Sequence, residues 1–153
     1  MAIMDIGCRG LLINGGGGAG KTAVGQAIGG ILTGRLLPTA VVDLDALAQY
    51  GPAPANQTGF HDRLKIRNLK AVWATYRAAG ARFVVVSGVI ETRELRDGYS
   101  ACLTGCDVQM VRLERARVQY DGHAQVEDFT VVNDRPLPKV ATEILEIAGW
   151  PTA

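Results

Sequence analysis

Residues 15–22 read Gly15-Gly16-Gly17-Gly18-Ala19-Gly20-Lys21-Thr22 and fit the pattern G-x-x-x-x-G-K-[ST]. The apolar run Leu11 to Asn14 precedes this segment and has the character of a buried strand. Residues Thr22 to Leu32 follow with apolar side chains at helical spacing. A strand, a glycine turn and a helix start are the context in which this pattern binds phosphate. The alternative interpretation is a glycine-rich turn that ends in Lys-Thr by chance.

The chemistry of this segment predicts a nucleoside triphosphate and Mg²⁺ as ligands. Glycines let the backbone wrap around an anion, so that successive N–H groups point inward. The helix N-terminus adds partial positive charge at the same place. We expect Lys21 to reach the β- and γ-phosphates and the Thr22 hydroxyl to ligate Mg²⁺.

The composition suits one globular domain that covers residues 1–153. With 16 basic and 15 acidic residues, the net charge of +1 gives no reason to expect a nucleic-acid partner. No apolar stretch approaches 18 residues, so no membrane partner is expected. Three cysteines, an odd number, favour a reducing, cytoplasmic location over a disulfide framework. We interpret Cys8, Cys102 and Cys106 as small apolar residues, and the spacing of the last two would place them on one helix face.

Alternating strand and helix signals predict an α/β fold, with three αβα layers around a five-stranded parallel sheet. Continuous apolar runs are typical of strands that are buried on both faces of such a sheet. The expected strands are Leu11–Asn14, Ala40–Asp43, Arg82–Ser87, Val108–Leu113 and Phe129–Val132. The expected helices are Thr22–Leu32, Asp62–Ala79 and Pro138–Ala148.

Two carboxylates, Asp43 and Asp45, end the second expected strand and should lie opposite the phosphate-binding loop. A carboxylate there can hold Mg²⁺ through water or accept a proton from a substrate hydroxyl. We assign Asp45 as the catalytic base and Asp43 to the metal. The alternative is that one of them caps a helix that starts near Ala46.

The order of these motifs resembles the small P-loop kinases that phosphorylate metabolites, such as adenylate, shikimate, gluconate and adenylylsulfate kinases. The third strand ends in Ser87-Gly88 rather than in the acidic residue of the Walker B pattern, a departure common among these kinases. Asn133-Asp134-Arg135-Pro136 is similar to the loop that lies against the nucleotide base. The resemblance therefore implies ATP as the nucleotide, with Asp134, Arg135 and Pro136 beside its base.

A local similarity to adenylylsulfate kinases lies in Leu44-Asp45-Ala46-Leu47, in Gly59-Phe60 and in Asn68. Lys65 stands where those enzymes have arginine, and their Lys-Gly-Leu-Tyr segment is absent, so adenylylsulfate is not the expected substrate. The polar residues Arg63, Lys65, Arg67 and Asn68 form either a substrate-facing edge or a solvated helix face.

The segment between Leu113 and Phe129 has only fifteen residues, too few for the arginine-bearing lid of these kinases. Arg115 and Arg117, with Arg112, are the candidate remnants of such a lid. The lid is therefore minimal, lost, or absent from the given sequence near Glu114. His123, in the same segment, is interpreted as a surface or capping residue.

We interpret the sequence as an ATP-dependent kinase that phosphorylates a hydroxyl of a small molecule. Lys21, Asp45 and Arg115 are the expected catalytic residues, and Thr22 and Asp43 the expected metal ligands. Residues 50–68 should shape the acceptor pocket, but no motif there identifies the acceptor. The alternative is a nucleotide-binding module without turnover, used as a switch or docking domain. A GTPase is disfavoured because no Asn-Lys-x-Asp segment is present.

Overall fold

The computed structural model describes residues 7–52, 61–115 and 126–152 of the 153-residue chain. Within these ranges no helix is both long enough and apolar enough to cross a bilayer. The strands are β1 (Cys8–Asn14), β2 (Thr39–Asp43), β3 (Phe83–Ser87), β4 (Cys106–Glu114) and β5 (Phe129–Val132). The helices are α1 (Lys21–Gly34), the 3₁₀ helix η1 (Leu44–Ala48), α2 (Asp62–Ala78), α3 (Arg93–Cys102) and α4 (Leu137–Ala148).

The five strands form one parallel sheet in the order β2-β3-β1-β4-β5, which confirms the predicted sheet. The central strand β1 pairs with β3 on one side and with β4 on the other. Asp43 is in register with Ser87, and Asn14 with Arg112, so the carboxyl ends of β2, β3, β1 and β4 form one edge. The loop that follows β1 begins at this edge.

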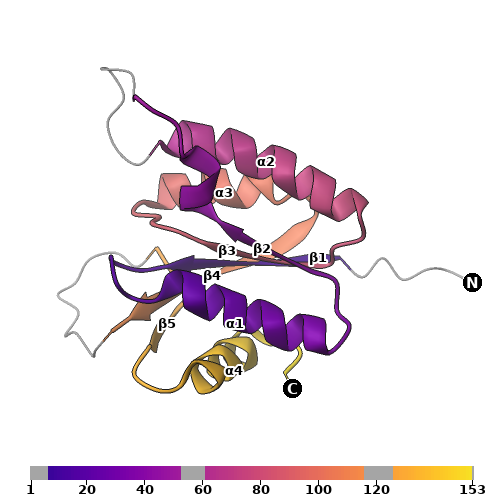
Figure 1. Cartoon of the computed structure of the whole chain (residues 1–153), viewed down its shortest axis with the longest axis vertical. Coiled ribbons are helices and arrows are strands. Elements are labelled where there is room, and N and C mark those ends of the chain that lie inside the picture. The colour runs from indigo at the N-terminus through magenta and orange to yellow at the C-terminus, as the bar shows by residue number, and fades with distance from the viewer. Residues whose placement is uncertain (1–6, 53–60, 116–125, 153) are drawn as a thin grey trace, which may run out of the picture.

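Helices cover both faces of the sheet, with α1 and α4 on one side and α2 and α3 on the other (Figure 1). Neighbouring residues of β1 show the division. Leu11 and Ile13 belong to the core beneath α1 and α4, whereas Leu12 belongs to the core beneath α2 and α3. All three side chains are fully buried. The continuous apolar runs therefore arise because each strand contributes to two cores.

Helix α1 packs so closely on the sheet that two of its positions have no room for a large side chain. A Cβ atom at Gly29 would lie 2.4 Å from Cγ2 of Val41 on β2. A Cβ atom at Gly25 would contact Ile13 and Val85 at 3.7 Å each. This close approach fixes the first turn of α1, where Lys21 and Thr22 lie, at the carboxyl edge of the sheet.

Helix α3 was not among the expected helices, and it corrects one expectation about the cysteines. The Thr92 hydroxyl caps α3 by accepting a hydrogen bond from the Leu95 N–H at 3.1 Å. Cys102 ends this helix, but Cys106 begins β4, so the two do not share a helix face. The predicted helix face was wrong because a turn at Gly105, with φ of 82°, separates them. All three cysteines are free thiols, and Cys8 and Cys102 are buried as expected.

Candidate active site

Residues 15–20 connect β1 to α1 and leave the first turn of α1 open to a ligand. Gly20 precedes the helix with a φ of 87°, in the left-handed region that glycine adopts readily. Gly20 has no side chain to cap the helix, and the first turn of α1 has no acidic residue. The first N–H groups of a helix have no partners within it, so these groups and the helix dipole suit an anion.

The start and the tip of this loop touch the end of β4. A Cβ atom at Gly15 would lie 2.5 Å from the carbonyl oxygen of Leu113, so only glycine fits there without a shift of the backbone. At the tip, a Cβ atom at Gly18 would lie 3.6 Å from Nη1 of Arg115. The guanidinium of Arg115 therefore lies beside the tip of the loop.

Asn133, directly after β5, holds the other end of the loop. Its Nδ2 donates to the carbonyl oxygen of Ala19 at 2.9 Å, and a Cβ atom at Gly20 would lie 2.6 Å from the same nitrogen. Its backbone N–H donates to the Glu114 carbonyl at 2.6 Å. Sequence analysis missed this role, although Asn133 opens the Asn-Asp-Arg-Pro segment that it singled out.

The Lys21 amine lies against the loop and close to both carboxylates of the second strand. Its Nζ donates to the carbonyl oxygens of Gly15 at 2.8 Å and of Gly16 at 3.1 Å. Burial lowers the pKa of Lys21 below its usual value, while the negative charges of Asp45 and Asp43 act in the opposite direction. The amine and the two carboxylates thus share one electrostatic environment.

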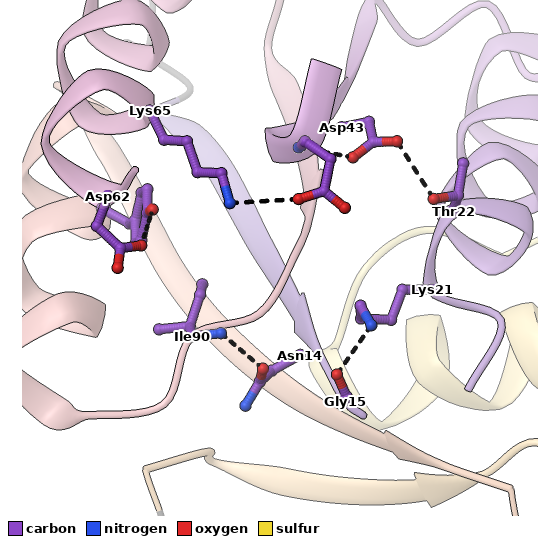
Figure 2. A network of polar contacts seen from close by, with 10 residues as sticks. Asn14, Gly15, Lys21, Thr22, Asp43, Asp62, Lys65 and Ile90 are labelled. Atoms are coloured by element: carbon purple, nitrogen blue, oxygen red, sulfur yellow. Dashed lines mark hydrogen bonds and ion pairs between the residues drawn. The ribbon is translucent and has the colours of Figure 1, made fainter. Parts of the chain in front are cut away.

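Asp43 makes two contacts, one relevant to its predicted role as a metal ligand and one to the alternative role as a helix cap (Figure 2). Its Oδ2 accepts a long hydrogen bond from the Thr22 hydroxyl at 3.4 Å, and its Oδ1 accepts from the Asp45 N–H at 3.0 Å. The second contact caps η1, so the capping alternative holds for Asp43. The first contact brings a hydroxyl and a carboxylate together at the loop, and both are oxygen ligands that suit Mg²⁺.

No protein-only metal cage accompanies this pair. Among the described residues, no group of three or more His, Cys, Asp or Glu side chains is arranged to hold a metal ion. Mg²⁺ at phosphate sites is commonly held by one or two protein oxygens, water and the phosphates themselves. Thr22 and Asp43 fit that donor set.

Asp45 extends from η1 and forms an ion pair with Lys65 of α2. The two atoms Oδ1 and Nζ are 3.2 Å apart, and the exposed fraction is 4% for the Lys65 side chain and 72% for that of Asp45. One turn farther along α2, the Asn68 amide donates to the Leu47 carbonyl at 2.5 Å. These contacts attach η1 to α2 at two points.

A cavity of about 530 Å³ lies between η1 and the start of α2. Among the described residues, its lining contains one imidazole, from His61, and no Asp, Glu, Lys or Arg side chain. The lining residues are Ala46, Leu47, Ala48, Gln49, Tyr50, His61, Leu64 and Asn68. Four of these residues fall within 50–68, where the sequence predicts the acceptor pocket, and the other four are residues 46–49, outside that range.

The remaining predicted residues separate into four groups. Arg63 and Arg67 are exposed on α2, in contrast to Lys65. Arg112 pairs with Glu114 at 2.7 Å and with Glu127 at 3.5 Å, and Arg135 pairs with Asp134 at 3.0 Å and with Glu143. Asp134 and Pro136 are exposed. Gly59, Phe60, Arg117 and His123, with most of the short segment after β4, lie outside the described residues.

Sequence analysis also missed a buried polar cluster beneath the site. The Asn14 side chain donates from Nδ2 to Glu127 Oε1 at 2.7 Å and accepts the Ile90 N–H at 2.8 Å. Asn14 and Glu127 are only 6% and 7% exposed. The signal in the sequence was a single amide at the end of an apolar strand, which does not reveal a partner 113 positions away.

The segment that carries Glu127 is fixed on both sides. Arg96 of α3 donates to the Val126 carbonyl and pairs with the Asp128 carboxylate at 2.7 Å. The backbone N–H of Asp128 donates to the Met110 carbonyl at 2.8 Å. The entry into β5 is therefore anchored to α3 and β4 as well as to β1.

The fold of this chain is similar to that of several solved structures. No protein-family model matches the chain, and no curated protein matches its sequence. APS kinase from Mycobacterium tuberculosis, solved with AMPPNP and APS, has a TM-score of 0.65 at 18% identity over 94% of this chain and 98% of that one. A gluconokinase from Sinorhizobium meliloti 1021 has a TM-score of 0.56 at 21% identity over 90% of each chain.

Shikimate kinase from Aquifex aeolicus has a TM-score of 0.58 at 14% identity, over 92% of this chain and 96% of that one. These neighbours are small-molecule P-loop kinases, and the identities are low enough that the likeness concerns the fold. The five-stranded parallel sheet with helices on both faces agrees with this similarity of fold. The chain has the α/β fold of the small P-loop kinases.

Proposed function

We propose that this protein is an ATP-dependent kinase that transfers the γ-phosphoryl group to a hydroxyl of a small molecule. The observation that carries the proposal is the position of Asp45. Its backbone N–H donates to one oxygen of Asp43, whose other oxygen accepts a hydrogen bond from the Thr22 hydroxyl at the end of the phosphate-binding loop. A phosphoryl donor on the loop and a proton acceptor on η1 would thus be adjacent.

In the proposed reaction, the acceptor hydroxyl oxygen forms a bond to the γ-phosphorus while the bond from this phosphorus to the β–γ bridging oxygen breaks. Asp45 accepts the hydroxyl proton, and ADP leaves. Lys21 neutralises the phosphates, and Arg115, beside Gly18, is suited to the charge of the transferring group. Thr22 and Asp43 would hold Mg²⁺, which supplies further neutralisation of the phosphates. Catalysis by these residues is positioning and charge stabilisation.

The cavity between η1 and α2 is the proposed acceptor side of the site. Its first lining residue, Ala46, directly follows Asp45 in the chain. The lining combines apolar side chains with amide, imidazole and phenol groups. The solved neighbours are named for APS, gluconate and shikimate, which are small metabolites. On the nucleotide side, Asp134, Arg135 and Pro136 are proposed to lie against the base.

A pooled metabolite library with MgATP tests the proposal through acceptor-dependent ADP release. The variant Asp45→Asn should lower this rate about 10²-fold and leave ATP affinity nearly unchanged, because it removes the general base alone. Asp107→Asn, an exposed aspartate on β4, is the matched control. Tight ATP binding by the wild type without any acceptor-stimulated turnover would favour the alternative, a nucleotide-binding module without turnover. The short segment after Leu113 is the feature that favours this alternative. Unimpaired transfer by Asp45→Asn would remove Asp45 from the mechanism.

A further inference from the structure

We propose that Lys65 is a positioning residue that holds the Asp45 carboxylate in place as the general base. The inference rests on the proposed function, since Asp45 needs positioning only if it accepts a proton. In this role the buried Lys65 ammonium orients the catalytic base and does not bind the acceptor or the phosphates.

The contrast in exposure between the two partners is the first argument. The Asp45 side chain is 72% exposed on a 3₁₀ helix of five residues, so packing alone does not select one rotamer for it. The Lys65 side chain is 4% exposed, and its Nζ lies 3.2 Å from Asp45 Oδ1. A buried cation with a fixed position can orient a carboxylate that solvent would otherwise leave free.

The second argument is the rigidity of the helix that carries Lys65. On the buried face of α2, Leu69 and Trp73 are 0% and 1% exposed within the core. At the start of the helix, the buried Tyr99 hydroxyl donates to Asp62 at 2.6 Å. The ammonium is therefore fixed relative to the sheet, and through the sheet relative to the phosphate-binding loop.

Third, the contacts of Asp45 hold its backbone N–H and one carboxylate oxygen, and they leave the other oxygen outside the ion pair. Its backbone N–H is held by Asp43 at 3.0 Å, and Oδ1 by Lys65 at 3.2 Å (Figure 2). Oδ2 takes no part in this ion pair and is the atom that accepts the hydroxyl proton in the proposed reaction. Asp45 is therefore held from two different elements, by Asp43 at the end of β2 and by Lys65 of α2. A displacement of the base by about 1 Å can cost two orders of magnitude in rate.

The test combines single and double variants, assayed with MgATP and the best acceptor from the pooled library. Lys65→Met keeps much of the buried apolar stem and removes the ammonium. We expect it to lower kcat about 10- to 100-fold, with KM for the acceptor and the Kd of MgADP nearly unchanged. Lys65→Arg should restore most of the rate. In an Asp45→Asn background, Lys65→Met should cost less than about twofold, because the residue acts through the base.

Lys70→Met, which removes an exposed lysine from the same helix, is the matched control and should behave as wild type. Thermal unfolding identifies any variant that fails to fold; if Lys65→Met does, Lys65→Gln, which also removes the ammonium, replaces it in both the wild-type and the Asp45→Asn background. An unchanged kcat in Lys65→Met, or an equal loss in the Asp45→Asn background, overturns the positioning role. A rise in KM alone also overturns it and assigns Lys65 to acceptor binding. Wild type without turnover overturns the proposed function and this role together, whereas an active wild type with a fully active Lys65→Met variant overturns only the latter.

Discussion

On the nucleotide side of the site, residues 15–22 supply backbone N–H groups, an amine and a hydroxyl from eight consecutive positions. On the acceptor side, and in the buried polar cluster beneath the site, the contacts join distant parts of the chain. Lys65 pairs with Asp45, 20 positions earlier, and Glu127 bonds to Asn14 across 113 positions. The first side depends on local geometry, and the second depends on how the sheet and α2 are assembled.

This difference has a consequence for mutations. A change within a local motif should affect ligand binding and leave the fold intact, because its groups point to the ligand. A change within a long-range cluster should affect the stability of the fold first. Three predictions test this separation.

The largest effect is expected from Lys21→Ala. If Lys21 binds the phosphates as proposed, loss of its ammonium should raise the Kd for ATP about 100-fold, measured by isothermal titration calorimetry. Because burial lowers the pKa of Lys21, its charged form is disfavoured in the fold, so the variant should unfold at or slightly above the wild-type temperature. Unchanged ATP affinity would overturn the phosphate-binding assignment, and a large loss of stability would contradict the separation of the two sides.

An intermediate effect is expected from Glu127→Ala on the other side. The change removes the acceptor of the Asn14 amide and one carboxylate partner of Arg112. A buried polar group left without its partner costs about 2 kcal/mol, which corresponds to a fall in Tm of about 4–8 °C for a chain of this size. Thermal and urea unfolding provide the measurement.

The control for this variant is Glu146→Ala, an exposed glutamate on α4 that should leave Tm within about one degree of wild type. The Kd for ATP should stay within about twofold in Glu127→Ala, because the loop backbone packs closely against the Leu113 carbonyl and is bonded by Asn133, and both contacts remain. A stable Glu127→Ala protein with much weaker ATP binding would reverse the comparison.

The smallest effect is expected from Asn133→Ala, which lies at the boundary between the two sides. Loss of its hydrogen bond to the Ala19 carbonyl should cost about 1 kcal/mol of loop stability, which weakens ATP binding about fivefold. Thr130→Ala, an exposed position on the preceding strand, is the control. An affinity equal to that of wild type would show that Gly20 and Ala19 hold their geometry without this amide.

The same comparison explains which features the sequence predicted. The phosphate-binding loop, the sheet and the strand β5 at Phe129–Val132 follow from contiguous patterns, and the structure agrees with them. Helix α3 was missed because only Tyr99 and Cys102 are buried in it, too few to set a period. The Thr92 cap was its clearest local signal.

Within the site, the sequence predicted residue types better than partners. Asp43 and Asp45 were placed at the correct edge because strand ends of a parallel sheet coincide. The partners Lys65, Asn133 and Glu127 depend on helix orientation and on the register of β4 and β5, which no single segment encodes. Arg135 illustrates the same limit, since the Asn-Asp-Arg-Pro motif does not reveal its pairing with Glu143 in the helix that follows, α4.

The central position of β1 in the sheet also determines when this strand can pair during synthesis of the chain. Its two neighbours in the sheet are β3 and β4, which occupy Phe83–Ser87 and Cys106–Glu114. A ribosome synthesises the phosphate-binding loop long before either neighbour exists, so β1 has no strand to pair with until much of the chain has emerged. Asn133 comes later still. The proposed nucleotide site, although encoded early and locally, is therefore completed only after β3, β4 and Asn133 have been synthesised.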